Sequence, residues 1–88
     1  MVWTIELSQE AVKNLKKISS ADAKRIRNYL RERIMVLEDP KLIGKQLKGA
    51  KLGNFWRYRV GNYRLICEIQ HDKLIVLVLI IGHRKDVY

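Results

Sequence analysis

Hydrophobic and polar residues alternate at both ends of this chain, while the segment between them follows a helical period. Period-two alternation covers residues 1–7 and the stretches near 54–60 and 63–70, and residues 74–81 are continuously apolar. Alternation predicts strands with one buried face, and a short apolar run predicts a strand buried on both faces. The pattern therefore predicts one strand at the start and three near the end.

Two helices are predicted between these strands. The first follows Ser8, a favourable N-cap residue, and its apolar positions are Ala11, Leu15 and Ile18. The second follows Ser19, with Asp22 three residues on as in a capping box, and its apolar positions are Ile26, Leu30, Ile34 and Leu37. Asp39 and Pro40 predict the end of this second helix, because proline cannot continue one.

These elements predict a single α+β domain over residues 1–88: an N-terminal strand, a two-helix hairpin and then an antiparallel sheet of three further strands. The pattern does not fix where the first strand joins that sheet. The longest apolar run, 74–81, is far shorter than the roughly 20 residues that span a bilayer. Cys67 is the only cysteine, so no disulfide can form within the chain, and a buried reduced thiol fits a cytoplasmic location.

A two-residue turn at Gly61 and Asn62 would set the register of the first two C-terminal strands. Counting outward from it, Arg59 faces Arg64, and alternation sends Arg57 to the same face. The other face carries Trp56, Tyr58, Val60, Tyr63, Leu65, Cys67 and Ile69. Like charges directly across a ladder cost up to about 1 kcal/mol, so the clustered arginines predict a bound anion, with a solvated basic face as the alternative.

The loop at residues 70–73 decides which face Arg84 joins. A two-residue turn there puts Arg84 opposite the arginine face. A three-residue turn at residues 71–73 puts Ile80, Gly82 and Arg84 on that face. The three-residue turn is preferred because it brings four arginines together, so it is an assumption of the functional interpretation and no independent support for it.

The chain is strongly basic, with 18 Lys and Arg against 9 Asp and Glu and a net charge of +9. Such an excess is typical of proteins that bind nucleic acid, and it also suits an acidic protein partner. The second helix carries a basic face opposite its apolar positions, which is a candidate contact for RNA or the ribosome, with a solvated face or an acidic partner as the alternatives. Its residues are Lys24, Arg25, Arg27, Arg31 and Arg33. In the connection that follows, residues 40–53, the candidates for phosphate contact are Lys45, Lys48 and Lys51. Candidates to stack on bases are Trp56, Tyr58, Tyr63 and Tyr88, of which Trp56 and Tyr63 suit the core better.

Several chemistries are disfavoured by the motifs. The chain has no glycine-rich phosphate loop and no Walker lysine. His71, His83 and Cys67 lack the spacing of a metal site, and neither histidine has a partner carboxylate that the sequence suggests for a nucleophilic triad. We therefore expect no metal and no cofactor.

The order of these motifs resembles the RelE toxins of type II toxin–antitoxin systems. The resemblance rests on the helical hairpin after a first strand, the Leu-Lys-Gly at 47–49, the Gly-Asn-Tyr-Arg-Leu at 61–65 and, most specifically, the terminal Gly-His-Arg-Lys-Asp-Val-Tyr at 82–88. It implies a ribosome-dependent endoribonuclease that cuts messenger RNA in the A site without a metal, by attack of the ribose 2′-hydroxyl. It also implies a cognate antitoxin of the RelB type. A ParE-like inhibitor of DNA gyrase, which is not an enzyme, is the alternative from the same superfamily.

Matching positions place the implied active residues at Arg57, Arg59, Arg64, Arg84 and Tyr88. In the family pattern Arg64 steadies the phosphate, Arg84 stabilises or protonates the leaving oxygen, and Tyr88 stacks on or orients the nucleotide. Lys85 joins the residues expected to contact RNA or the ribosome. Well-known members carry lysines where this chain has Arg57 and Arg59, and arginine is a poor proton acceptor. His83 is then a candidate base, with packing at a strand end as its alternative role.

Overall fold

The computed structural model describes residues 3–47 and 55–83. Within them, a five-stranded sheet has the order β1-β5-β4-β3-β2. The strands are β1 (Thr4–Leu7), β2 (Lys45–Gln46), β3 (Phe55–Val60), β4 (Tyr63–Gln70) and β5 (Ile75–His83). All neighbours are antiparallel except β1, which runs parallel to β5 at one edge. The predicted α+β fold is confirmed, and the first strand, which the sequence could not place, makes the sheet mixed.

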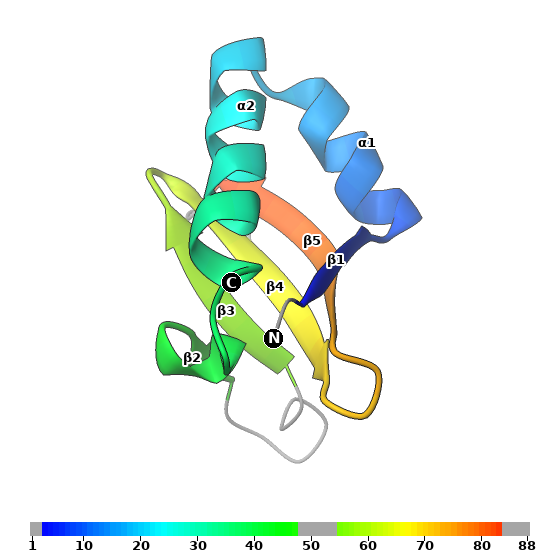
Figure 1. The fold of residues 1–88 in the computed structure, drawn as a ribbon. Helices are drawn as coiled ribbons and strands as arrows, with labels where there is room; N and C mark the ends of the chain where they lie inside the picture. The colour runs from blue at the N-terminus through cyan, green and yellow to red at the C-terminus, as the bar shows by residue number, and fades with distance from the viewer. Residues whose placement is uncertain (1–2, 48–54, 84–88) are drawn as a thin grey trace.

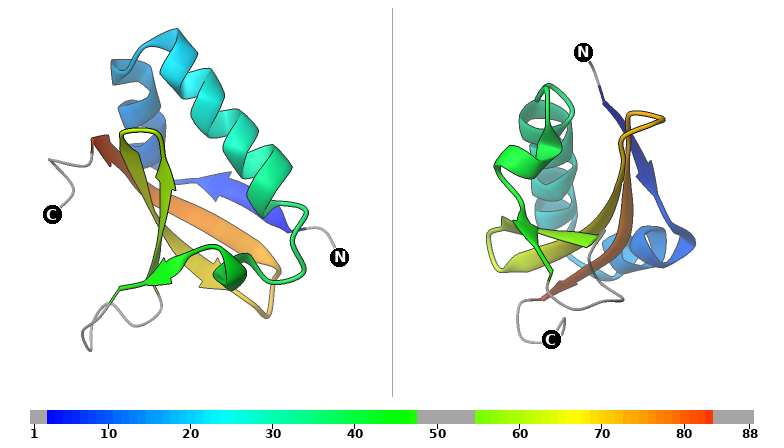
Figure 2. Two further views of the ribbon diagram at one scale, coloured as in Figure 1. Left: turned by 90° about the vertical axis from the view of Figure 1, so that its left-hand side faces the viewer. Right: turned by 90° about the horizontal axis from the view of Figure 1, so that it is seen from below.

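Both predicted helices are present and lie on the same face of the sheet (Figures 1 and 2). They are α1 (Gln9–Lys17) and α2 (Ser20–Tyr29), and α2 continues as the π-helical turn η1 (Leu30–Ile34). The Ser8 hydroxyl accepts from the Ala11 N–H at 3.0 Å, and the Ser19 hydroxyl accepts from the Asp22 N–H at 3.1 Å. Both predicted N-caps are therefore confirmed. No helix in the described ranges is long and apolar enough to cross a membrane.

The second helix ends at Ile34, five residues before the predicted end at 39–40. The Met35 N–H still donates to the Leu30 carbonyl at 2.9 Å, but the Met35 carbonyl accepts from the Trp3 N–H at 3.0 Å. In a continuing helix, that carbonyl would accept a hydrogen bond from a backbone N–H of the next turn. The Trp3 N–H thus occupies an acceptor that a longer helix would need. The predicted end was wrong because it depends on this contact between segments that are far apart in the sequence.

Asp39 begins a short helix and does not end the long one. Its carboxylate accepts from the Lys41 N–H at 3.0 Å and caps the 3-10 turn η2 (Pro40–Leu42), where proline suits the first position. The chain then forms β2, which the sequence analysis read as part of a surface connection. A two-residue strand is too short to produce an alternating pattern.

The core lies between the helices and the sheet (Figure 2). Its fully buried large side chains are Trp3, Ile26, Ile34, Tyr58, Leu65, Cys67, Val76 and Val78. The Trp3 indole N–H donates to the Glu38 carbonyl at 2.9 Å, which satisfies the polar atom of an otherwise buried ring. Cys67 is a buried free thiol, as predicted, and burial raises its pKa.

The turn between β4 and β5 has four residues, 71–74, because Gln70 pairs with Ile75. The predicted three-residue turn at 71–73 is therefore wrong. Leu74 closes the turn with a φ of 54°, a left-handed conformation that is uncommon for leucine. Its side chain packs against the core, which gives a reason to keep an apolar residue at this position.

A β-bulge in β5 shifts the register of its second half. Ile66 pairs with Ile80 and Cys67 pairs with Val78, so Leu79 is an extra residue without a partner on β4. One extra residue exchanges the two faces of everything that follows it. The four-residue turn and the bulge together restore the predicted alternation, so Ile80 and Gly82 lie on the arginine face as expected.

Helix α1 holds this bulge in place. The Ser8 hydroxyl donates to the Leu79 carbonyl at 2.7 Å, and the Asn14 side-chain oxygen accepts from the Ile81 N–H at 2.9 Å. Beyond Val78, where the pairing with β1 ends, backbone groups of β5 are thereby satisfied by polar side chains. Ser8 serves both as the helix cap and as an anchor for β5.

Candidate functional site

Three arginines meet on the sheet face that points away from the helices. Arg59 pairs directly with Arg64 across the β3–β4 ladder, and Arg57 precedes Arg59 by two residues on the same face. Tyr58 and Val60, which alternate with them, are buried on the helix side. Arg59 is exposed, whereas Arg57 and Arg64 are half-buried with their Nε atoms fully covered. The predicted pairing and the predicted face are both confirmed, and we call these residues the arginine face.

The β3–β4 turn makes this register possible. Gly61 has a φ of 59° and occupies the first central position of a two-residue turn, where a type II′ turn requires glycine. Because the turn has two residues, every pair outward from Val60 and Tyr63 is fixed. A one-residue slip would send the arginines into the core.

Strand β2 adds a lysine to the arginine face. Lys45 pairs with Arg57 and is exposed, so this predicted phosphate contact does join the cluster. The chain passes close to β3 here, because a Cβ on Gly44 would lie 2.9 Å from the Tyr58 ring. The Tyr58 hydroxyl donates to the Pro40 carbonyl at 2.7 Å. Glycine at position 44 therefore lets β2 approach β3.

Tyr58 is 1% exposed, so the expectation that it stacks on a base is wrong. Burial is the main cause that raises its pKa. Trp56 and Tyr63 are partly buried and pack against the core, which is the role the sequence favoured for both. Lys41 places its ammonium 5.5 Å from the centre of the Trp56 ring, within the range of a cation–π contact.

His83 lies on the other face of the sheet from the arginines. It pairs with Tyr63, and the two rings meet edge-on with their centres 5.9 Å apart. The Tyr63 hydroxyl donates to Asp22 at 3.0 Å, and this hydrogen bond is the first cause that raises the pKa of Tyr63. The structure thus places His83 near the start of α2 and does not bring it together with Arg59 and Arg64.

The end of β5 lies beside the arginine face, since Gly82 pairs with Arg64. The remaining expected site residues lie outside the described residues: Lys48, Lys51, Arg84, Lys85 and Tyr88. Among the described residues, no group of three or more His, Cys, Asp or Glu side chains could hold a metal ion.

The basic residues of α2 and η1 do not share one face. All are exposed: Lys24, Arg25, Arg27, Arg31 and Arg33. Arg25 and Arg33 line a hollow against β3, and Arg27 and Arg31 line an apolar groove against β1. The helix therefore contributes arginines to two different surfaces, and the sequence analysis, which treated them as one face, missed this division.

Tyr29 lies near the site and was not predicted as a site residue, whereas Arg33 was predicted only as part of the basic face of the helix. They follow Arg25 at intervals of four along one flank of α2 and η1. Residues four apart on a helix lie on the same side, so the sequence does carry this pattern. It could not be distinguished from a solvated helix face until β3 was placed opposite.

Chemically, the arginine face can hold and neutralise a phosphate. Guanidinium groups present several fixed N–H donors in one plane and form bidentate contacts with phosphate oxygens. Rigid strands on both sides of a tight turn position these donors without further rearrangement. Donors fixed in advance stabilise charge that develops on oxygen during a reaction.

Comparisons with known proteins agree with this geometry. A family model described as the ParE toxin of the type II toxin–antitoxin system parDE matches residues 5–88. Toxin RelE3 of Methanocaldococcus jannaschii is 38% identical over 79 residues, which cover 88% of this chain and 85% of the relative. The mRNA interferase toxin RelE of Escherichia coli K12 is 26% identical over 86 residues, which cover 97% of this chain and 86% of the relative.

The fold also matches that of one chain in a solved toxin–antitoxin complex. The RelBE2 complex of Mycobacterium tuberculosis contains a chain that matches with a TM-score of 0.85 and 23% sequence identity. The match covers 98% of this chain and 95% of that chain. At this identity the match shows the shared fold alone.

Proposed function

The chain belongs to the RelE/ParE family of toxins from type II toxin–antitoxin systems, and we propose that it is a ribosome-dependent endoribonuclease that cleaves messenger RNA in the A site and stops translation. The observation that carries this proposal is the Arg59–Arg64 pair on the exposed sheet face, with Arg57 beside it. The E. coli relative named as an mRNA interferase supports the choice of reaction.

In the proposed reaction the ribose 2′-hydroxyl attacks the neighbouring phosphate and the 5′-oxygen leaves. Negative charge grows on the phosphoryl oxygens as the bond forms, and Arg64 with Arg59 would stabilise that charge. The RelE resemblance supplies the remaining roles, with Arg84 at the leaving oxygen and Tyr88 against the nucleotide. Arg57 would help to hold the RNA phosphate, because a guanidinium group donates several hydrogen bonds and is a poor proton acceptor.

The base that accepts the 2′-hydroxyl proton is a separate question. His83 is the candidate base that the sequence suggests, because imidazole is a common general base in enzymes. It lies on the helix side of the sheet beside Tyr63. A role as base would require RNA to reach around the end of β5, so we propose that electrostatic stabilisation carries the greater part of the rate.

The decisive experiment maps cleavage of a defined message on ribosomes with an open A site, by primer extension, beside the same RNA without ribosomes. We expect a cut on ribosomes alone. In the Arg64→Ala variant we expect cleavage to slow by about 10²–10³-fold, the usual loss for one fixed donor in a transition state. Lys16→Ala, an exposed change on α1, serves as the matched control and should cut at the wild-type rate.

A second candidate function is inhibition of DNA gyrase without catalysis, because the matching family model is described as a ParE toxin. The same preparation tests it in a gyrase supercoiling assay. Intact message on ribosomes together with loss of supercoiling would replace the nuclease proposal. Cleaved message with normal supercoiling would exclude the alternative.

For a partner, we propose a cognate antitoxin of the RelB type, as the solved M. tuberculosis relative is a toxin–antitoxin complex. The net charge of +9 favours an acidic segment that lies along basic surface and neutralises it. A disordered segment can cover a large area in this way and stabilise a small core by binding only the folded state. Ribosomes and messenger RNA would be the other partners, in the cytoplasm.

A further inference from the structure

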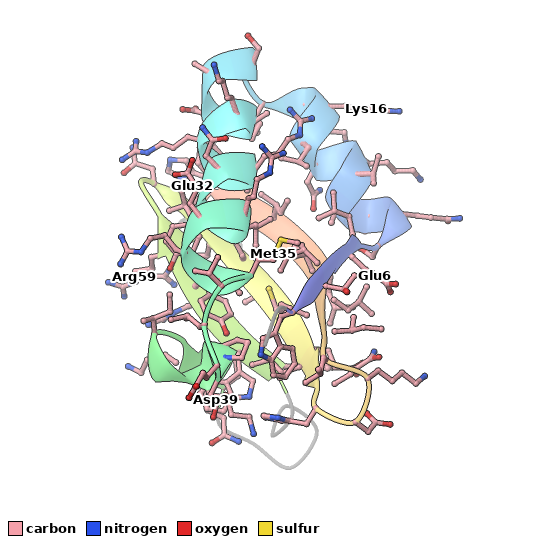
Figure 3. The ribbon with its side chains drawn as sticks, in the orientation of Figure 1. Glu6, Lys16, Glu32, Met35, Asp39 and Arg59 are labelled. Carbon is pink, nitrogen blue, oxygen red and sulfur yellow. The ribbon has the colours of Figure 1, made fainter. Side chains whose placement is uncertain are left out.

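A groove of about 590 Å³ separates α2 and η1 from the turn end of β3. We call it the α2–β3 groove. Its charged lining residues are Arg25, Glu32, Arg33 and Arg59. Figure 3 shows Arg59 at the outer side of β3, on the same side of the molecule as Glu32. The groove thus collects guanidinium groups from a helix and from a strand that are distant in sequence.

Arg25 sits directly against the hairpin turn. A Cβ built on Gly61 would lie 2.9 Å from Arg25 Nη1 and 3.2 Å from its Cζ. Glycine at position 61 therefore leaves room for the Arg25 guanidinium at one end of the groove. The turn also requires this glycine for its positive φ.

The positive charge in the groove is not neutralised within the described chain. In residues 3–47 and 55–83, no carboxylate lies within ion-pair distance of Arg25, Arg33 or Arg59. Asp22, the nearest acidic residue along the helix from Arg25, accepts the hydroxyl of Tyr63 instead. Glu32 is the one acidic residue in the lining. Like charges facing one groove repel each other unless an anion lies between them.

The groove is continuous with the arginine face. Strand β2 pairs with Trp56 and Arg57 only, so the rest of β3 as far as Val60 has no neighbouring strand on that side in the described structure. Around this open edge, Arg59 lines both the α2–β3 groove and a second hollow of about 360 Å³ that contains Lys45 and Arg57. A basic surface therefore runs from the arginine face, around the edge of β3, to α2.

We propose that the α2–β3 groove binds backbone phosphates of single-stranded RNA, so that one strand passes from the arginine face around the edge of β3 and along Arg25 and Arg33. The lining favours a nucleic acid over a protein, because it offers three guanidinium groups and the Asn28 amide for phosphates, and its aromatic residue, Tyr29, is partly exposed. The inference rests on the proposed function for the identity of the ligand as RNA. It assigns Arg25 and Arg33, but not Arg27 and Arg31, to the path of the strand.

The test measures RNA binding without ribosomes and without cleavage. The probe is a fluorescein-labelled 12-nucleotide RNA with 2′-O-methyl groups, which removes the nucleophile, and its affinity is followed by anisotropy across a series of salt concentrations. Each phosphate contact with single-stranded RNA contributes about 0.7 to the slope of log affinity against log salt. We expect the double variant Arg25→Ala/Arg33→Ala to lower that slope by about 1.4.

The matched control is Lys13→Ala/Lys16→Ala, which removes the same charge from exposed positions of α1. It should leave the slope unchanged, and Arg25→Lys/Arg33→Lys should keep most of it. Equal slopes for the groove variant and the α1 control would overturn the inference, as would a wild-type protein that does not bind the probe. A groove variant that binds RNA normally but escapes its antitoxin would also overturn it and assign the groove to an acidic protein.

Failure of the groove and failure of the proposed nuclease are distinguishable. If the wild type leaves messages intact on ribosomes but the slope falls in the groove variant, the nuclease proposal fails and the phosphate groove stands. If messages are cut on ribosomes and the slope is unchanged in the groove variant, the nuclease proposal stands and the phosphate groove fails. Melting curves of both double variants verify that the exposed substitutions leave the fold intact.

Discussion

The two flanks of α2 and η1 show how one helix can carry similar residues and form two different surfaces. Toward β3, Arg25 and Arg33 face Arg59 and the Gly61 turn across the α2–β3 groove. Toward β1, Arg27 and Arg31 border a second groove, and we call it the α2–β1 groove. Its apolar lining residues are Ile5, Leu7, Leu30 and Met35, and Figure 3 shows Met35 between the helix and β1.

The difference lies in the opposite wall and not in the helix. All four arginines are exposed and sit on the same two helical segments. Those that face a basic strand edge form a site for a polyanion, whereas those that border apolar strand residues can lay their methylene stems over that surface and keep the charge in water. The role of a charged helix residue is therefore set by the element that folds against it.

The largest effect that separates the flanks should come from Leu30→Ala. Leu30 is 4% exposed and belongs to the core, so its truncation should lower the free energy of unfolding by about 2–5 kcal/mol. Arg33→Ala, on the other flank, should change it by no more than about 0.5 kcal/mol while weakening RNA binding. Urea denaturation measures stability. Anisotropy without urea, at a temperature where both variants are folded, measures RNA affinity.

The comparison would fail if the two effects were not separable. If a folded Leu30→Ala protein showed a smaller slope of log RNA affinity against log salt, the α2–β1 groove would also contact the RNA. Unchanged stability would mean that Leu30 does not contribute to the core as its burial indicates.

The sequence predicted the features that depend on local chemistry. A two-residue turn with glycine at its first position fixed the pairing of Arg59 with Arg64, and the two serine caps fixed the starts of the helices. Period two then placed the arginines away from the core. Each of these inferences needs only neighbours within a few residues, or a turn that sets everything around it.

The features that the sequence did not predict depend on contacts between distant segments. The bulge at Leu79 is held by Ser8 and Asn14, about 70 positions earlier in the chain. The helix ends where Trp3 takes the Met35 carbonyl. The division of the α2 arginines between two grooves likewise requires β3 and β1 to be placed, and no periodicity within the helix contains that information.

Alkaline pH should lower the free energy of unfolding through buried groups on α2, β3 and β4. Burial is the first cause that raises the pKa of Tyr58 above its ordinary value of 10.0, and it also raises the pKa of Tyr29 and Cys67. The folded state then holds protons that the unfolded chain releases, so stability is fully present below the unfolded pKa values and falls as pH rises beyond about 9–10. The apolar residues of the α2–β1 groove carry no titratable group.

We therefore expect the free energy of unfolding to decline between pH 9 and 11 and Tyr58→Phe to flatten that decline. The phenylalanine variant should start from lower stability at pH 7, because the Pro40 carbonyl loses the hydroxyl that donates to it at 2.7 Å. Denaturation curves at a series of pH values give both quantities. A Tyr58→Phe curve parallel to that of the wild type would place the alkaline sensitivity elsewhere.

The smallest effect we predict is an increase in RNA affinity for Glu32→Gln. Glu32 is the acidic residue in the lining of the α2–β3 groove, and a carboxylate roughly 8 Å from a phosphate in water repels it by about 0.5 kcal/mol. Removing that charge should strengthen binding of the 2′-O-methyl RNA about twofold at low salt and have little effect at high salt, where screening is strong. Glu6→Gln is the matched control, since Glu6 is exposed on β1 on the opposite side of the molecule (Figure 3). If both variants gain equally, the net charge of the protein explains the change and the groove has no special role; if Glu32→Gln alone gains, the phosphates lie beside Glu32, on the β3 flank of the helix.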